Sequence, residues 1–88
     1  MYYVYFLKSL KNMKNKNFYT GYTNDLRKRL KEHNEGKVFS TKSWRPFRVI
    51  YYEGYLDEDD AKRREKYLKS GMGKRDLRNR LRSYLEKV

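Results

Sequence analysis

Three ionisable residues fall where apolar residues would be expected. Arg29 and His33 lie on or beside the inward stripe of one predicted helix, and Glu65 lies on the inward stripe of another. An unpaired buried charge is costly, so each side chain must be paired, open to a cleft, or functional. Singly, Glu65 has an ordinary explanation as an ion-pair partner and His33 as a satisfied helix-end side chain. Their coincidence in one short chain favours a functional site.

A strand pattern opens the chain. Residues 2–7 are aromatic or β-branched without a helical period, which predicts a strand covered on both faces. Alternation divides its side chains into two sets, Tyr3, Tyr5 and Leu7 against Tyr2, Val4 and Phe6. The polar run 11–17 predicts a turn, and residues 18–22 resume the strand pattern, so a hairpin is expected. Gly21 in this second strand marks a close backbone approach.

A helix is predicted over residues 26–35, because N-cap oxygens precede it at 23–25 and Gly36 follows as a stop. Its inward stripe consists of Leu26, Leu30 and His33. A third strand is predicted over residues 47–55. Trp44 in the loop before it could stack on a base, but packing against the sheet edge is the better interpretation.

Four acids at positions 57–60 predict the start of a second helix, where they favour its positive end. Its inward stripe is Ala61, Glu65 and Leu68. After a helix stop and restart at residues 71–73, a third helix is predicted with an apolar stripe of Leu77, Leu81 and Leu85. The segment 71–74 lacks the spacing of a phosphate-binding loop. The pattern as a whole predicts an α+β fold, a small antiparallel sheet with helices.

Composition narrows the classes of function. The chain has 88 residues, a net charge of +12 and no cysteine, which excludes disulfides, cysteine-bound metals and thiol chemistry. Its length predicts a single domain over residues 1–88. With no long apolar run or signal pattern, we expect a cytoplasmic protein with no membrane partner. The positive charge indicates a polyanion, first of all nucleic acid.

The two strand motifs carry a family resemblance. Tyr3-Val4-Tyr5 and Tyr19-Thr20-Gly21 stand where the GIY and YIG tripeptides stand in the GIY-YIG nuclease superfamily, and Arg29, His33 and Glu65 follow in that family's order. The chain resembles the stand-alone, single-domain bacterial members. It departs from the motif at Tyr3, where the family has glycine, and at Thr20, where it has an aliphatic residue.

The resemblance implies a three-stranded antiparallel sheet flanked by helices and a catalytic set of Tyr5, Tyr19, Arg29, His33 and Glu65. Glu65 would hold a single Mg²⁺ or Mn²⁺, and Arg29 would neutralise the scissile phosphate. One of the two tyrosines would be the general base while the other orients phosphate or water, and His33 would assist proton transfer or bind phosphate. The other ten acids are interpreted as solvated or helix-start charges.

The function that the resemblance implies is metal-dependent endonuclease cleavage of DNA, with weak or structure-based selectivity and DNA repair as a setting. The alternative is a non-catalytic nucleic-acid-binding module with the same fold. Four residues are candidate nucleic-acid contacts, namely Lys42, Arg45, Arg78 and Arg82. The last two lie on a basic helix that could equally be a solvated face. We expect a monomer, and a targeting protein partner is left open.

Overall fold

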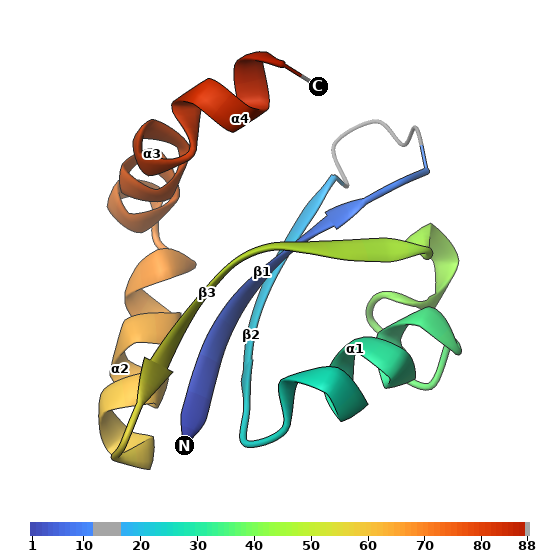
Figure 1. The fold of residues 1–88 in the computed structure, drawn as a ribbon, viewed down its shortest axis with the longest axis horizontal. Coiled ribbons are helices and arrows are strands. Elements are labelled where there is room, and N and C mark those ends of the chain that lie inside the picture. Colours follow the sequence, from blue (N-terminus) through green and yellow to red (C-terminus); the bar gives the residue numbers. More distant parts are fainter. Residues whose placement is uncertain (12–16, 88) are drawn as a thin grey trace.

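A three-stranded antiparallel sheet forms the centre of the fold. The computed structural model describes residues 1–11 and 17–87, so most of the predicted turn at 11–17 lies outside the described residues. The strands are β1 (Tyr2–Ser9), β2 (Phe18–Thr23) and β3 (Phe47–Tyr55). Their order is β2-β1-β3, which places β1 in the middle and leaves β2 as an edge strand (Figure 1). The predicted α+β fold with this sheet is confirmed.

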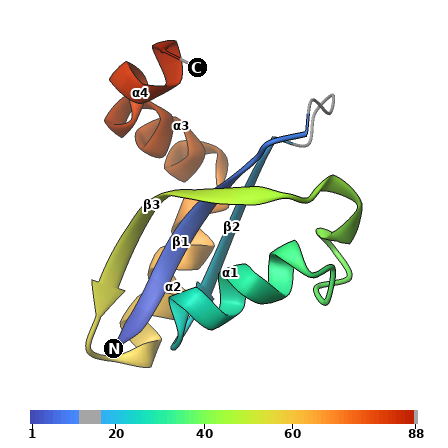
Figure 2. The same ribbon diagram turned by 45° about the vertical axis from the view of Figure 1, so that its right-hand side comes forward.

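Helices cover both faces of the sheet. They are α1 (Leu26–Asn34), the 3₁₀ turn η1 (Lys42–Trp44), α2 (Glu58–Leu68), α3 (Gly71–Arg80) and α4 (Arg82–Glu86). Figures 1 and 2 show α1 on one side of the sheet and α2 on the other. No helix in the described part of the chain is long and apolar enough to cross a membrane.

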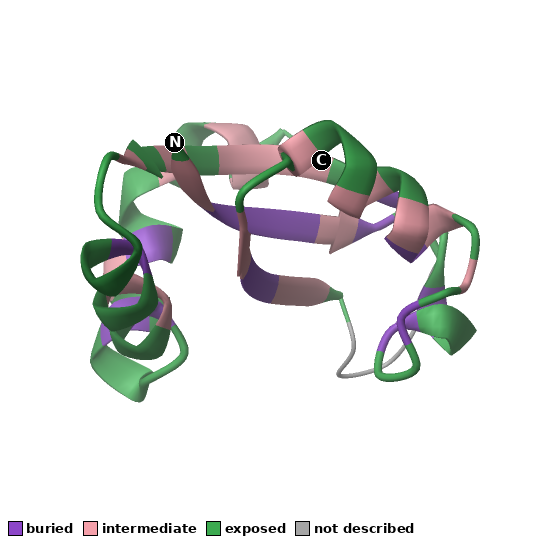
Figure 3. Ribbon diagram, turned by 90° about the horizontal axis from the view of Figure 1, so that it is seen from below, coloured by how far each residue is buried: buried purple, intermediate pink, exposed green. Residues whose placement is uncertain are grey.

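The alternation of β1 divides the core into two clusters. Val4 and Phe6 pack with buried residues of α2 and α3, whereas Tyr5 and Leu7 pack with Trp44 and with residues of α1 and β3. The strand is therefore covered on both faces, as predicted. In Figure 3 the buried positions gather on the central strand and on inward helix faces. Trp44 itself is buried, which confirms the packing interpretation.

The polar residues at the helix starts act as predicted. The side chain of Asp25 accepts a hydrogen bond from the backbone N–H of Lys28, and Asp57 accepts one from Asp59. Gly36 follows α1 with a positive φ of 78°. These contacts satisfy backbone groups that a helix end leaves open.

The prediction of one third helix is wrong. The helix is interrupted at Leu81, so α3 and α4 are separate, and Leu81 and Leu85 are only half-buried. The predicted break at residues 71–73 is also misplaced, because α3 begins at Gly71 and includes Gly73. A Cβ on Gly73 would lie 1.9 Å from the carbonyl oxygen of Tyr67, so this glycine lets α3 start against the end of α2.

Glu53 contradicts the prediction that every acid except Glu65 is a solvated or helix-start charge. Its carboxylate accepts two hydrogen bonds from Arg64, at 2.9 and 3.0 Å, and one each from Tyr51 and Tyr55. Burial opposes ionisation of Glu53, but the bonds from Arg64 and the tyrosines prevail and lower its pKa. Its role is to fasten β3 to α2.

Candidate active site

The Tyr5 hydroxyl lies over the backbone of the edge strand. Tyr5 on β1 is paired with Gly21 on β2, and a Cβ on Gly21 would be 2.5 Å from Tyr5 Oη and 3.0 Å from the ring of Tyr19. Only glycine leaves room for the two aromatic side chains at this point. The predicted close approach at Gly21 is confirmed.

His33 connects Tyr5 to the loop that follows α1. Its side chain is fully buried, with Nε2 2.8 Å from Tyr5 Oη and Nδ1 2.8 Å from Thr41 Oγ1. The rings of Tyr5 and Tyr19 both lie edge-on to the imidazole, with centroids 5.7 and 5.1 Å away. The imidazole is thus held on both nitrogens and packed between aromatic rings.

Burial keeps Tyr5 and His33 neutral. It raises the pKa of Tyr5 to about 12; Arg29 opposes this rise, whereas the charges of Tyr19 and Glu65 add to it. Burial, reinforced by the positive charge of Arg29 and opposed by Glu32, lowers the pKa of His33 to about 4. At neutral pH the proton between them therefore resides on the tyrosine.

Arg29 lies at the border of this cluster. It projects from α1 beside the Tyr5 hydroxyl, where its charge favours the ionised phenol. It also pairs with Glu32 at 3.2 Å, and 37% of its side chain is exposed. A half-buried surface pair of this kind contributes little stability, so Arg29 can exchange Glu32 for an anionic ligand at small cost.

Glu65 reaches the cluster from α2. The expectation that it faces the core is only partly correct, since Ala61 and Leu68 are buried but 20% of the Glu65 side chain is exposed. Its Oε2 pairs with Lys69 Nζ at 3.3 Å, and that ammonium lies 5.8 Å from the centre of the Tyr19 ring. The carboxylate stands at the edge of the sheet, close enough to Tyr5 to raise its pKa.

The structure thus brings the five predicted residues together from two strands and two helices. Two further residues belong to the same cluster, Thr41 through His33 and Lys69 through Glu65. Lys69 follows Glu65 by four residues in a predicted helix, so helical spacing could have found it. Thr41 lies in an aperiodic segment and gave no such signal.

The four candidate nucleic-acid contacts lie in two separate places. Arg78 lines a pocket of about 630 Å³ beside Tyr19, together with Lys69 and Lys74, and Arg82 is exposed at the start of α4. Lys42 and Arg45 belong to the segment around η1, on the opposite side of the molecule (Figure 1). Only Arg78 borders the cluster.

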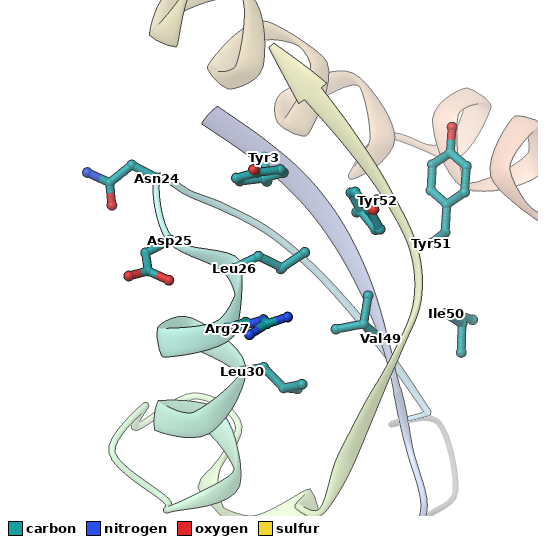
Figure 4. Close-up of a pocket in the computed structure, with 10 residues that line it drawn as sticks. All are labelled: Tyr3, Asn24, Asp25, Leu26, Arg27, Leu30, Val49, Ile50, Tyr51 and Tyr52. Atoms are coloured by element: carbon teal, nitrogen blue, oxygen red, sulfur yellow. The ribbon is translucent and has the colours of Figure 1, made fainter. Parts of the chain in front are cut away.

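A larger groove lies away from the cluster. It has a volume of about 810 Å³ between α1 and β3, where Leu26 and Leu30 face Val49 and Tyr52 (Figure 4). None of the five predicted site residues lines it. Its walls are mainly apolar and aromatic, so it does not suit a phosphate.

The cluster offers few acidic side chains as ligands for a metal ion. The described residues contain no group of three or more histidine, cysteine or acidic side chains that could hold a metal ion. The fitting ligand is the carboxylate of Glu65, whose salt bridge with Lys69 engages Oε2. Mg²⁺ often takes one or two carboxylates and completes its shell with water and phosphate oxygens, so this donor set fits a hard divalent ion.

Comparison with known families identifies this arrangement of strands and helices. The family model described as the GIY-YIG catalytic domain matches residues 1–79. The chain belongs to the GIY-YIG family, a family of nucleases, and the predicted resemblance is confirmed.

Among curated proteins the chain is similar to small bacterial proteins named UPF0213. It is 40% identical over 70 residues to one from Clostridium perfringens, covering 78% of this chain and 71% of that protein. It is 44% identical over 57 residues to YazA of Bacillus subtilis, covering 64% of this chain and 58% of that protein. These names state no activity. No solved structure matches the chain.

Proposed function

We propose that this protein is a divalent-metal-dependent endonuclease that hydrolyses phosphodiester bonds in DNA, with weak or structure-based selectivity. The observation that carries the proposal is the convergence of Tyr5, Arg29, His33 and Glu65 at the open edge of β2, over the glycine at position 21. A base, a cation for phosphate and a metal-binding carboxylate are what this hydrolysis needs.

Arg29 and Lys69 are proposed to bind the scissile phosphate. Arg29 can release Glu32 and present its planar guanidinium to two phosphate oxygens. Lys69 is held between Glu65 and Tyr19, so it supplies a second positive charge on the same side. Together they would offset the negative charge that develops on phosphorus as water attacks.

Glu65 is proposed as the only protein ligand of Mg²⁺ or Mn²⁺. The ion, when bound, would polarise the phosphate and stabilise the departing oxygen. Without the ion, Glu65 would neutralise Lys69, so the pair would bring no net positive charge to the phosphate. The position of Glu65 in the cluster therefore supports an enzyme over a module that only binds.

The DNA strand is proposed to leave the site along the basic pocket beside Tyr19. Lys69, Lys74 and Arg78 line this pocket, and none of its other described lining residues is acidic. Backbone phosphates would bind there by charge and not by sequence, which accords with weak selectivity. Lys42, Arg45 and Arg82 lie outside this pocket and are proposed as outer contacts.

The alternative is a nucleic-acid-binding module without catalysis. It would use the same basic pocket, and it has no need of the hydrogen-bonded pair of Tyr5 and His33. Cytoplasmic location, a role in DNA repair, a monomeric state and a single domain over residues 1–88 stay predictions, as does a targeting partner.

Incubation with DNA tests the proposal. The purified protein should cut at least one of supercoiled, nicked and branched DNA in Mg²⁺ or Mn²⁺, and EDTA should stop the reaction. If it binds all three with salt-dependent affinity but cuts none of them, the binding module is correct and the endonuclease is not.

A further inference from the structure

A chain of hydrogen-bonding groups runs inward from the proposed active site. Tyr5 Oη lies 2.8 Å from His33 Nε2, His33 Nδ1 lies 2.8 Å from Thr41 Oγ1, and Thr41 Oγ1 lies 3.4 Å from the carbonyl oxygen of Val38. Tyr5, His33 and Thr41 are all buried. Because little water reaches these groups, they must satisfy one another.

The last acceptor favours one direction of the chain. The Val38 carbonyl accepts the backbone N–H of Thr41 at 3.1 Å and can also accept the Thr41 hydroxyl, at 3.4 Å; a hydroxyl that donates there uses its own oxygen to accept from His33 Nδ1–H. A neutral imidazole protonated on Nδ1 has an accepting Nε2. The Tyr5 hydroxyl then donates to Nε2, and its oxygen remains free to accept from Arg29 or from water.

The reverse direction satisfies fewer groups. If Thr41 donated to Nδ1, Nε2–H would donate to Tyr5, whose oxygen already faces the guanidinium of Arg29. Arg29 has only donors, so the Tyr5 O–H would lack an acceptor among the described side chains. Water would then be its acceptor, whereas in the first direction the buried O–H donates to Nε2 and the Tyr5 oxygen can accept from Arg29, so the first direction satisfies more groups within the protein.

We propose that Thr41 is a positioning residue that holds His33 in the Nδ1–H tautomer and thereby makes Tyr5 the tyrosine that takes the proton of the attacking water. This inference rests on the proposed function. Tyr19 contacts His33 through its ring, and among the described residues no hydrogen bond joins its hydroxyl to the imidazole. Tyr19 is therefore left to orient water or phosphate.

In the proposed step, Tyr5 and His33 carry the proton of the attacking water away from phosphorus. The water oxygen forms a bond to phosphorus while its proton passes to Tyr5 Oη and the phenolic proton passes to His33 Nε2. The bond from phosphorus to the leaving oxygen breaks, and that oxygen takes a proton from solvent. His33, briefly an imidazolium, returns its Nε2 proton to Tyr5 Oη as Tyr5 releases the proton of the attacking water to solvent, so the site ends in its starting protonation state.

The tautomer can be observed without any reaction, because His33 is the only histidine in the chain. Nitrogen-15 NMR of the metal-free protein at pH 7 should show a protonated Nδ1 and an unprotonated Nε2. Thr41→Val removes the acceptor at nearly constant volume, and a substantial share of Nε2–H tautomer should appear. Thr41→Ser keeps the hydroxyl and should restore the parent spectrum.

The kinetics of DNA cleavage provide a second test of the role of Thr41. Thr41→Val should lower kcat by about 10-fold to 100-fold with little change in KM, and Thr41→Ser should recover most of it. A parent protein with the Nε2–H tautomer, or a Thr41→Val variant that keeps Nδ1–H, would overturn the inference even if DNA is cut. If Thr41→Val does not fold, the parent and Thr41→Ser spectra decide, and an Nε2–H tautomer in either refutes it. Absence of cleavage with the expected tautomer would instead count against the proposed nuclease function.

Discussion

Tyr5 and Gly21 are paired across β1 and β2, and the tyrosine hydroxyl occupies the space that a side chain at position 21 would need. A Cβ there would be 2.5 Å from Tyr5 Oη. The contact between Tyr5 and His33 therefore requires a glycine at position 21.

Gly21→Ala should displace Tyr5 and disable the site without unfolding the protein. Insertion of a methyl group into a packed site costs about 1–3 kcal/mol. We expect that loss in urea unfolding, together with a changed His33 NMR signal and a strong loss of cleavage. The control is Gly71→Ala, because a Cβ there meets nothing within 4 Å. An alanine at position 21 that left the His33 signal as in the parent would contradict the account.

The buried histidine should make stability depend on pH. The pKa of His33 is about 4 in the folded protein, against about 6.5 in an unfolded chain, so between these values the unfolded state binds more protons. Stability is therefore complete above about pH 6.5 and falls as the pH decreases toward 4. From pH 7.5 to pH 5 the loss should be about 2 kcal/mol.

Urea unfolding at several pH values between 5 and 7.5 measures this slope. The charged and titratable groups that face His33 are Tyr5, Tyr19, Arg29 and Glu32. His33→Gln should flatten the slope. An unchanged slope in His33→Gln would assign the pH dependence to other residues.

The carboxylate of Glu53 should contribute to stability and not to chemistry. Glu53→Gln removes the charge that holds Arg64, Tyr51 and Tyr55, and it leaves a half-buried guanidinium poorly paired. We expect a loss of about 2 kcal/mol in the free energy of unfolding. Glu86→Gln, at an exposed position of α4, should stay within about 0.5 kcal/mol of the parent. Equal stability of the two variants would refute the fastening role.

The pocket beside Tyr19 should carry part of the DNA affinity. Arg78→Gln removes a cation from that pocket, so the slope of log affinity against log salt should fall by about one, with little change among DNA sequences. Arg75→Gln changes the same net charge on the same helix but outside the pocket, and its effect should be smaller. Equal effects would mean that α3 attracts DNA only through its total charge.

The positions of the candidate site residues could be predicted from the sequence because each falls in a periodic element. Strand alternation and helix periodicity placed Tyr5, Arg29 and Glu65 on their elements, and the family resemblance gave their order and their expected roles. Thr41 could not be found in this way, since its role depends on how the loop after α1 folds over His33. Glu53 was missed for a related reason: its partners Tyr51 and Tyr55 are local, but the decisive Arg64 comes from another element. The break at Leu81 gave no glycine or proline signal.

The cluster around Tyr5 and Glu65 is proposed to cleave DNA with a divalent metal. The most direct test is the cleavage rate of a branched DNA in Mg²⁺ or Mn²⁺ by the parent protein, by Glu65→Gln and by the control Glu86→Gln. Cleavage is expected from the parent and the control, with a loss of at least about 100-fold for Glu65→Gln and DNA binding retained. Cleavage by Glu65→Gln at the parent rate would contradict the proposal.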